Sequence, residues 1–587
     1  MSSIDSSLPP VSRRGVLAGS GVAAGTLALS GSPAFAARPG RKVAVLGGGM
    51  AGLTAAHELV ERGFKVTVFE PSAWGGKARS IPVPNTARGG RRDLPGEHGF
   101  RFFPGFYHHV PNTMRRIPFG KGTVGDHLAD ATGGKFYRAG DRADGFIFGL
   151  GPDPEQVLTV DGMRRFLMDT LGGNSVPPQE LAWFVTRLLV FLTSCEGRRF
   201  KQWEHLSWWD FVGANTRSKE YQTILASGLT RSLVAARADV ASTRTIGNMG
   251  EAFIMNMMGR GNDGALDRVL DLPTNEAWIN PWMRHLRRLG VKFVGGHRLV
   301  RYEVNKGRIE AAILRDRRNR RHRFEADWFV SAMPVERARE TLTSAVLKHA
   351  PHLRRLDALK PDWMVGIQYF LREPIKLTHG HISFIDSPWA LTALTQGQFW
   401  KDRKISRDYG DGKVRDILSV DISNWSTPGI LYNKPAKQCS PAQIAREVLA
   451  QIRAHETAGA QLPDKIIHSW FLDPGVAWNP KRKRNTNATP LLINTVGSWD
   501  DRPEARSGIP NLLLSGDYVR TNIDLATMEG ANESARAAVN AILDERGSRA
   551  SRAEMFTLYK PAEFEALKMV DEQLYKLGLP NALDLPL

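Results

Sequence analysis

The pattern of hydrophobic positions predicts a strand, a turn and a helix where the folded part of the chain begins. Lys42 to Leu46 is an apolar run typical of a parallel strand that is buried on both faces. Glycines interrupt the sequence from Gly47 to Gly52, and Leu53 to Arg62 then follows with helical spacing. A second strand is predicted from Phe64 to Phe69, which gives the order strand, helix, strand.

Similar segments occur far downstream. Ala326 to Ser331 and Asn511 to Leu514 are apolar runs that predict two more strands, and a helix is predicted from Met528 to about Leu543. Because these segments lie hundreds of residues apart, we expect an α/β fold whose doubly wound, nucleotide-binding (Rossmann) domain is discontinuous in sequence.

Chain length leads to the same division. At 587 residues the chain exceeds what one hydrophobic core fills, so two interleaved domains are expected. We assign residues 40–120, 271–344 and 501–545 to the nucleotide-binding domain. We assign the remaining blocks to a mixed α+β substrate domain, at 121–270 and 345–500, and to a helical C-terminal tail, at 546–587.

The glycines after the first strand follow the G-x-G-x-x-G pattern that binds a dinucleotide. Gly47 permits a tight turn, Gly49 lets the backbone approach a diphosphate, and Gly52 allows close packing of helix on strand. The start of the helix, at Met50 and Ala51, would direct free N–H groups at the anion. We therefore predict that these five residues contact a cofactor.

The segment after the second strand decides which dinucleotide is expected. Glu70 is placed to hold a ribose hydroxyl, and its charge disfavours a 2′-phosphate, which leaves NAD and FAD. Gly75 and Gly76 follow beside two cations, Lys77 and Arg79, that could lie against the diphosphate or the flavin. This segment resembles the G-G-[RK] segment of the superfamily of FAD-dependent amine oxidases and carotenoid desaturases.

That resemblance implies a glutathione reductase-like FAD domain with a second set of contacts near the C-terminus. Gly516 and Asp517 end a predicted strand, where Asp517 could bind ribityl hydroxyls. The helix that opens at Met528 and Glu529 would stabilise negative charge on a reduced flavin. Val300 is a candidate contact on the adenine side. The resemblance implies non-covalent FAD, because no cysteine follows Cys439 for a covalent link.

Two further motifs indicate the subfamily. The segment from Glu97 to Tyr107, E-H-G-F-R-F-F-P-G-F-Y, resembles the E-x-G-x-[HR] … G-x-Y segment of plant-type phytoene and zeta-carotene desaturases. L-A-T-M-E-G-A, from Leu525 to Ala531, is similar to their L-A-S-M-E-G-A. The resemblance implies hydride transfer to FAD from an isoprenoid or carotenoid-like lipid. Reduction of the kind performed by hydroxysqualene dehydroxylase-like proteins is a related alternative.

Flavin amine oxidation is a second alternative. Many amine oxidases have a tyrosine just before M-E-G-A as one wall of an aromatic cage, whereas this chain has Thr527. A formal net charge of +19 also repels cationic amines at long range. Candidate catalytic residues are Arg101, His98 and Thr527. Arg101 and His98 are expected near the flavin, and the structural alternative for Arg101 is an ion pair with Glu97.

An apolar segment indicates a lipophilic partner or a large core. Leu181 to Leu192 predicts a strongly apolar helix, and it is followed by Trp203, Trp208, Trp209 and Phe211. These residues either line a tunnel mouth that contacts a membrane surface or form the core of the substrate domain. Reoxidation of the flavin would use oxygen or a quinone. No nucleic-acid motif accompanies the positive charge, so a nucleic-acid partner is not expected.

The first residues predict export. Arg13 and Arg14 lie in a twin-arginine pattern, and a Gly/Ala-rich apolar run then leads to an A-x-A site ending at Ala36. We expect a signal at residues 1–36 and an extracytoplasmic mature protein, either free or associated with a membrane surface. The two cysteines, Cys195 and Cys439, lie far apart without clustered histidines, so neither a disulfide framework nor a metal site is expected.

Overall fold

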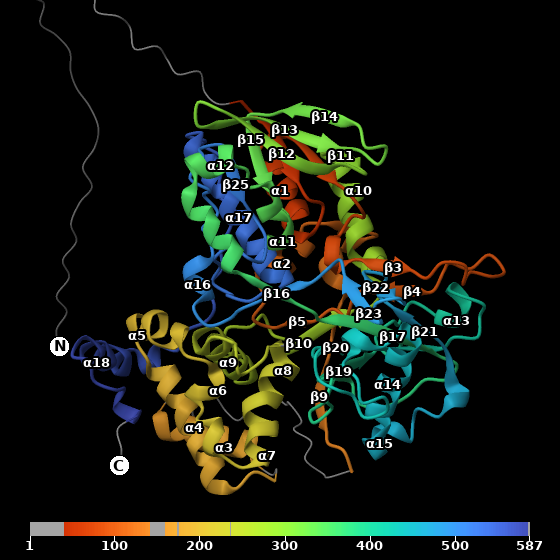
Figure 1. Ribbon diagram of the computed structural model, residues 1–587, viewed down its shortest axis with the longest axis vertical. Coiled ribbons are helices and arrows are strands. Elements are labelled where there is room, and N and C mark those ends of the chain that lie inside the picture. Colours follow the sequence, from red (N-terminus) through yellow and green to blue (C-terminus); the bar gives the residue numbers. More distant parts are fainter. Residues whose placement is uncertain (1–39, 141–158, 173–174, 235, 585–587) are drawn as a thin grey trace, which may run out of the picture. The chain divides into compact units, whose positions relative to one another are not determined.

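The structure is a computed structural model that describes residues 40–140, 159–172, 175–234 and 236–584 (Figure 1). The predicted export signal, residues 1–36, lies outside these residues. Among the helices of the described part, none is both long enough and apolar enough to cross a bilayer.

A five-stranded parallel sheet contains all four strands predicted from the apolar runs, in the order β11-β2-β1-β15-β25. Its strands are Lys42–Leu46 (β1), Lys65–Glu70 (β2), Lys292–Gly295 (β11), Trp328–Ser331 (β15) and Leu512–Leu514 (β25). The central strands are almost entirely apolar because both of their faces are buried. Chain segments more than 400 residues apart thus meet in one sheet.

Helices cover this sheet. Met50–Glu61 (α1) packs against Met528–Glu545 (α17) and against Asn280–Arg288 (α10). The chain forms a separate three-stranded antiparallel sheet between β11 and β15, which lies at the top of Figure 1. Its strands are Arg298–Asn305 (β12), Arg308–Arg315 (β13) and Arg321–Glu325 (β14).

A six-stranded sheet forms the centre of the second region, in the order β21-β17-β20-β19-β18-β9. Its strands are Gly133–Tyr137 (β9), Val365–Leu371 (β17), Gly380–Phe384 (β18), Leu391–Thr395 (β19), Asp416–Ile422 (β20) and Ile467–Leu472 (β21). Side chains alternate between the faces of a strand. Ile367, Leu418 and Val420 therefore pack in a core with Pro441–Arg453 (α14), whereas Gly366 and Asp421 lie on the opposite face.

A helical cluster completes this region. It contains Val160–Leu171 (α3), Pro178–Thr193 (α4), Glu196–Lys201 (α5), Trp208–Phe211 (α6) and Thr243–Met257 (α9). Trp203, Trp208 and Phe211 are only 3%, 3% and 2% exposed and pack against α4 within its apolar core. Of the two interpretations of these aromatic residues, the packing supports the core, and the tunnel-mouth interpretation is wrong for these three.

The structure corrects two expectations about chain segments. Val346, Leu353 and Leu356 pack in the core of the parallel sheet, although the sequence division assigned residues 345–500 to the substrate domain. The C-terminal tail is helical only at Ala562–Phe564, Glu565–Lys576 (α18) and Ala582–Asp584. Residues 549–561 are not helical because side chains of the parallel-sheet region, such as Asn540, bind their backbone groups instead.

Candidate cofactor and substrate site

The glycine turn after β1 is shaped by close backbone contacts. Gly47 has a φ of +125°, and a Cβ atom there would lie 2.2 Å from the carbonyl oxygen of Ala332. A Cβ on Gly52 would lie 1.9 Å from the carbonyl oxygen of Gly47, so only glycine lets α1 approach β1 this closely. For a Cβ on Gly49, the one atom of the described residues within 4 Å, apart from its chain neighbours, would be the Cα of Gly76, at 3.7 Å. The space beside Gly49 is therefore open to a ligand.

The beginning of α1 offers an anion site in that open space. Gly49 is the N-cap of this 12-residue helix, and no side chain caps it among the described residues. The N–H groups of Met50 and Ala51 therefore have no intrahelical partner. Gly75 and Gly76 form a second turn opposite, with φ values of +89° and +57°, and the Gly75 N–H donates to the carbonyl of Gly48. Two glycine turns thus enclose a place for a diphosphate.

Glu70 ends β2 next to this turn. Its carboxylate accepts hydrogen bonds from the N–H of Gly48 at 2.9 Å and from the N–H and hydroxyl of Ser72, both at 2.8 Å. Because each carboxylate oxygen can accept more than one hydrogen bond, capacity remains for ribose hydroxyls. These hydrogen bonds hold the side chain in one orientation, and its contact with a ribose stays a prediction.

Lys77 and Arg79 flank the glycine turn but are bound by the protein. Lys77 Nζ lies 3.3 Å from Oε1 of Glu336 and also contacts the carbonyl of Pro490. Arg79 donates to the carbonyl of Gly76 at 2.6 Å. Direct pairing of either cation with a diphosphate would thus compete with these contacts.

Val300 occupies an irregular position in β12. The pairing of β12 with β13 passes from Leu299 to Arg301 and skips Val300, which marks a β-bulge. Val300 thus has no Cα partner in that ladder. The adenine-side contact of Val300 stays a prediction.

The second predicted cofactor segment follows β25. The Gly516 N–H donates to the hydroxyl of Ser534 at 3.0 Å. Among the described residues, none donates a hydrogen bond to the half-buried carboxylate of Asp517, which leaves it available for ribityl hydroxyls. Thr527 caps α17, because its hydroxyl accepts a hydrogen bond from the N–H of Gly530 at 3.1 Å. The N–H groups of Met528 and Glu529 then have no intrahelical partner.

The side chain of Glu529 does not face the cofactor region. Its carboxylate accepts hydrogen bonds from the N–H groups of His108, His109 and Val110 at 2.6 to 2.9 Å, and it lies 2.8 Å from Nδ1 of His109. Burial alone would raise the pKa of Glu529, but these partners outweigh burial and lower it. The carboxylate of Glu529 is thus occupied by the protein, and the predicted contact with the flavin falls to the backbone N–H groups at the start of α17.

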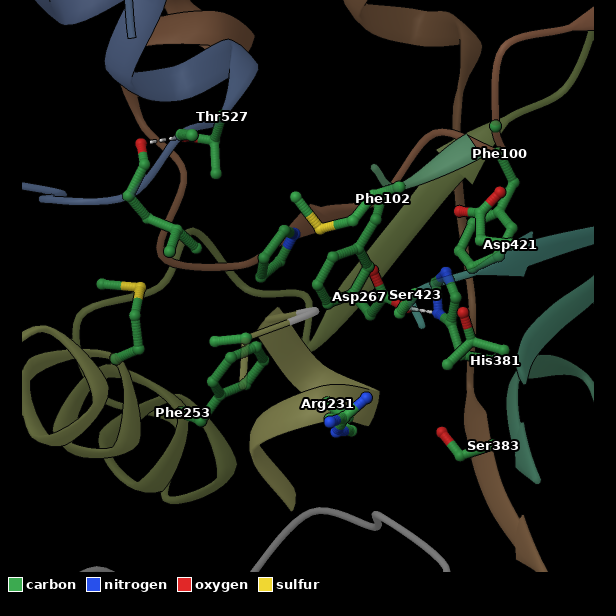
Figure 2. A pocket seen from close by; sticks show the side chains of 18 of the residues that line it. Phe100, Phe102, Arg231, Phe253, Asp267, His381, Ser383, Asp421, Ser423 and Thr527 are labelled. Carbon is green, nitrogen blue, oxygen red and sulfur yellow. Dashed lines mark hydrogen bonds and ion pairs between the residues drawn. The ribbon is translucent and has the colours of Figure 1, made fainter. Parts of the chain in front are cut away.

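A cavity of about 350 Å³ lies between the start of α17 and the six-stranded sheet. Its lining includes Thr527 and Leu525 beside α17, and Asp421 and His381 on the sheet. Figure 2 shows Asp421 and His381 grouped on one side of the cavity and Thr527 on another. Apolar side chains dominate the remaining wall, among them Phe100, Phe102, Phe106, Ile246, Met249, Phe253, Met257 and Leu266.

His98 and Arg101, the predicted catalytic candidates, both line this cavity. Nδ1 of His98 lies 2.5 Å from a carboxylate oxygen of Asp473, and burial would raise the pKa of Asp473 but His98 holds it below its usual value. Nε2 of His98 is buried without a partner among the described residues. Arg101 lies 3.4 Å from Glu97, so the alternative of an ion pair is confirmed.

Asp267, His381 and Asp421 are polar residues of the cavity that were not predicted from the sequence. Nδ1 of His381 lies 2.5 Å from a carboxylate oxygen of Asp267, which β10 (Asp267–Leu270) supplies. Burial raises the pKa of Asp421 to about 7, although Arg101 and His381 act in the opposite direction. Two aspartates within the largely apolar strand D-I-L-S-V-D-I were the signal that could have found Asp421.

One cluster in the parallel-sheet region has the residue types of a metal site. Atoms of His57, Glu61 and His285 lie within 4.8 Å of one another. However, the indole N–H of Trp282 donates to Nδ1 of His57 at 3.2 Å. In neutral His57 the proton is then on Nε2, which faces Glu61 at 3.0 Å, so this nitrogen has no lone pair for a metal. We assign no metal here.

The parallel sheet, the glycine turns and the adjoining cavity place the molecule in the class of flavin-dependent oxidoreductases. The chain belongs to the family of flavin containing amine oxidoreductases, whose sequence profile matches residues 50–543. The predicted superfamily and the prediction of a flavin-dependent enzyme are confirmed at this level.

Individual proteins are similar to this chain in sequence or in structure. The chain is 28% identical over 222 residues to carotenoid phi-ring synthase of Streptomyces griseus, and 25% identical over 283 residues to that of Chlorobaculum tepidum. These matches cover 34% and 47% of this chain, and only 36% and 40% of those relatives. Cyclohexylamine oxidase from Brevibacterium oxydans is similar in structure, with a TM-score of 0.57 and 14% identity over 86% of this chain and 99% of that one. At that identity the likeness establishes the fold alone.

Proposed function

We propose that this chain is a FAD-dependent desaturase of an isoprenoid or carotenoid-like lipid. The carrying observation is the cavity, whose wall is formed largely by aromatic and aliphatic side chains and which begins at the capped start of α17. The similarity to carotenoid phi-ring synthases supports the same class of substrate. Such a substrate buries well in an apolar cavity and has little need for hydrogen bonds.

FAD fits the residues present and would bind without a covalent link. The free N–H groups at the start of α1 and the space beside Gly49 suit a diphosphate, Glu70 suits a ribose, and Asp517 suits the ribityl chain. Both cysteines are buried as free thiols in other parts of the fold. Bound FAD supplies an acceptor for the hydride that leaves the substrate.

The protein's own contribution to this reaction is mainly positioning. A hydrocarbon has no polar handle, so the walls must align the reacting carbon by shape. Phe102 and Phe253 stack on each other with ring centroids 6.2 Å apart, and Phe106 meets Phe253 edge to face at 5.0 Å. This set of rings offers a rigid, apolar surface to a polyene chain and excludes water from it.

Amine oxidation is less well supported by the charges of the cavity. Among the described residues, four cationic side chains line it, namely Arg101, Lys135, Arg231 and Arg237, against two carboxylates, Asp267 and Asp421. This balance disfavours a cationic ammonium group. A reductive reaction of the hydroxysqualene dehydroxylase-like kind needs a hydroxyl on the substrate and an external electron donor.

Product analysis separates these reactions. We would incubate the FAD-loaded protein with squalene-type and carotene-type lipids, with oxygen or a quinone as acceptor, and weigh the products by mass spectrometry. Loss of two hydrogen atoms supports desaturation. Loss of a hydroxyl from an alcohol substrate, or release of an aldehyde and peroxide from an amine panel alone, would replace the proposal.

We also propose export by the twin-arginine route and contact with a membrane surface. The supports are the Arg13-Arg14 pattern and the formal net charge of +19, which attracts anionic lipid headgroups. Cell fractionation of the full chain and of an Arg13→Lys, Arg14→Lys variant tests this. A wild-type protein that stays in the cytoplasm would overturn it.

A further inference from the structure

The six-stranded sheet presents a polar wall to the cavity. Asp421 of β20 is in register with Gly366 of β17 on one side and with Thr392 of β19 on the other. His381 of β18 lines the same wall. Since a hydrocarbon forms no hydrogen bonds with such groups, binding of the substrate alone does not account for them.

Two glycines make room for the carboxylate of Asp421. A Cβ atom on Gly99 would lie 2.7 Å from its Oδ1, and a Cβ atom on Gly366 would lie 2.9 Å from the same atom. Neither position tolerates a larger residue without displacing this group or the backbone. The local structure thus accommodates one carboxylate at the edge of the cavity.

Asp421 differs from the other titratable groups of the cavity in having no charged partner. Arginine and lysine are cations without a free lone pair. His98 pairs with Asp473 and His381 pairs with Asp267, each through Nδ1 at 2.5 Å, and Nε2 of both imidazoles is buried without a partner among the described residues. Among the same residues, Asp421 has no cation within ion-pair distance, and no group donates a hydrogen bond to its Oδ1. Asp421 is therefore the carboxylate of the cavity that no ion pair holds.

We infer that Asp421 is the proton acceptor of the reaction and that His381, fixed by Asp267, is a positioning residue that controls the charge around it. This inference rests on the desaturation proposed above. The charged groups that face Asp421 are Arg101 and Glu97, from the segment after β4 (Pro95–Glu97), and His381 from β18.

The proton balance of a desaturation requires such a group. One carbon loses a hydride, with both electrons of its C–H bond, to oxidised FAD. The neighbouring carbon loses a proton to the Asp421 carboxylate, and the electron pair left behind forms the new double bond. A carboxylate also stabilises the positive charge that develops on the substrate. Asp421 then releases the proton to water before the next turnover.

The pH dependence follows from the same surroundings. Burial raises the pKa of Asp421 to about 7, and Arg101 and His381 lower it from the value that burial alone would give. The acceptor must be ionised, so hydride transfer should become faster as the pH rises through about 7. A base whose pKa lies near the working pH is well suited to this task.

Asp421→Asn tests the inference, with Asp416→Asn as the matched control. Asp416 lies on the opposite face of the same strand, burial raises its pKa to about 6, and it accepts backbone hydrogen bonds away from the cavity. We would measure anaerobic reduction of bound flavin by a lipid substrate in a single turnover. Asp421→Asn should be slower by roughly 100- to 10,000-fold, whereas Asp416→Asn should stay within about threefold of wild type.

An infrared titration of the holoenzyme without substrate gives a second readout. A protonated carboxyl band with a midpoint near pH 7 should be present in wild type and in Asp416→Asn and absent from Asp421→Asn. His381→Gln should move this midpoint to higher pH, because it removes a group that lowers the pKa of Asp421. The shift of the midpoint in His381→Gln can be measured even if Asp421→Asn does not fold.

These experiments distinguish an error in the role of Asp421 from an error in the proposed desaturase activity. If wild type reacts with the lipid and Asp421→Asn reacts equally fast, the inference is wrong and the desaturase proposal stands. An unchanged infrared midpoint in His381→Gln also overturns it. If no lipid reduces the flavin of wild type, the desaturase proposal is wrong and the inference is lost with it.

Discussion

Gly366 and Asp421 face each other across β17 and β20, and a Cβ atom on Gly366 would lie 2.9 Å from Oδ1 of Asp421. The same Cβ would lie 2.7 Å from the carbonyl oxygen of His98, to which the Gly366 N–H donates. One glycine thus connects the sheet of the second region, the carboxylate of the cavity and the segment that contains two catalytic candidates. This close contact leaves no space for a side chain at position 366.

Gly366→Ala should lower the free energy of unfolding by about 1 to 3 kcal/mol, because the methyl group overpacks a site formed by backbone. Denaturant unfolding measures this. Gly250→Ala in α9 is the control, since nothing lies within 4 Å of a Cβ there, and it should be neutral or slightly stabilising. If both substitutions changed the free energy of unfolding equally, the contact at Gly366 would not be tight.

Two neighbouring glycines should separate folding from cofactor binding. Gly49→Ala meets only the Cα of Gly76 at 3.7 Å, so the protein should fold but bind FAD at least about tenfold more weakly, because the methyl group occupies the diphosphate space. Gly52→Ala would place its methyl group 1.9 Å from a carbonyl oxygen and should prevent stable folding.

Flavin content and thermal unfolding of the two variants distinguish these outcomes. A Gly49→Ala protein that retains wild-type flavin content would show that the diphosphate does not lie beside Gly49. A Gly52→Ala protein of wild-type stability would contradict the close packing of α1 on β1.

Glu529→Gln should destabilise the fold strongly. Glu529 is 2% exposed and connects α17 to three backbone N–H groups and to His109, so removal of its charge leaves these donors and the imidazole poorly matched, at a cost of about 3 kcal/mol. Glu545→Gln at the exposed end of α17 should cost less than about 1 kcal/mol. If both substitutions lowered the free energy of unfolding by a similar amount, the buried hydrogen bonds of Glu529 would not stabilise the fold.

This contribution should depend on pH. The pKa of Glu529 is lowered in the fold, so its stabilisation is complete above the pKa of an unfolded glutamate, about 4.3, and is lost as the pH falls through the lower folded value. The stability difference between wild type and Glu529→Gln should therefore narrow in acid. A difference that is constant from neutral to acid pH would contradict this.

Asp421→Asn should have the opposite pH dependence. Between pH 3.8 and about 7 folded Asp421 keeps a proton that the unfolded chain has released, so its contribution to stability falls as the pH rises. The variant cannot titrate there and should gain up to about 4 kcal/mol relative to wild type across this window. Melting temperatures measured from pH 4 to 8 test this, and parallel curves would show that the pKa of Asp421 is not raised.

The cofactor half of the molecule was largely predictable from sequence. β1, α1, β2 and α17 were found within a few residues of their bounds, because an apolar run, a glycine turn and a helical period are local signals. The direction of the Glu529 side chain was not, since its partners lie about 420 residues away.

The cavity was harder to predict for a related reason. Asp267, His381 and Asp421 come from three different strands, and no local spacing announces that they meet. Trp203 and Trp208 have the same apolar character whether they form a core or a tunnel, so composition alone could not decide between these places.

Anaerobic mixing of the purified, flavin-loaded protein with candidate substrates shows directly which of them reduces the flavin. The visible band of oxidised flavin is followed while squalene-type or carotene-type lipids are added in one series and amines in another. A lipid desaturase should lose the band with lipids and not with amines. Loss of the band with amines alone would contradict the proposed desaturase activity.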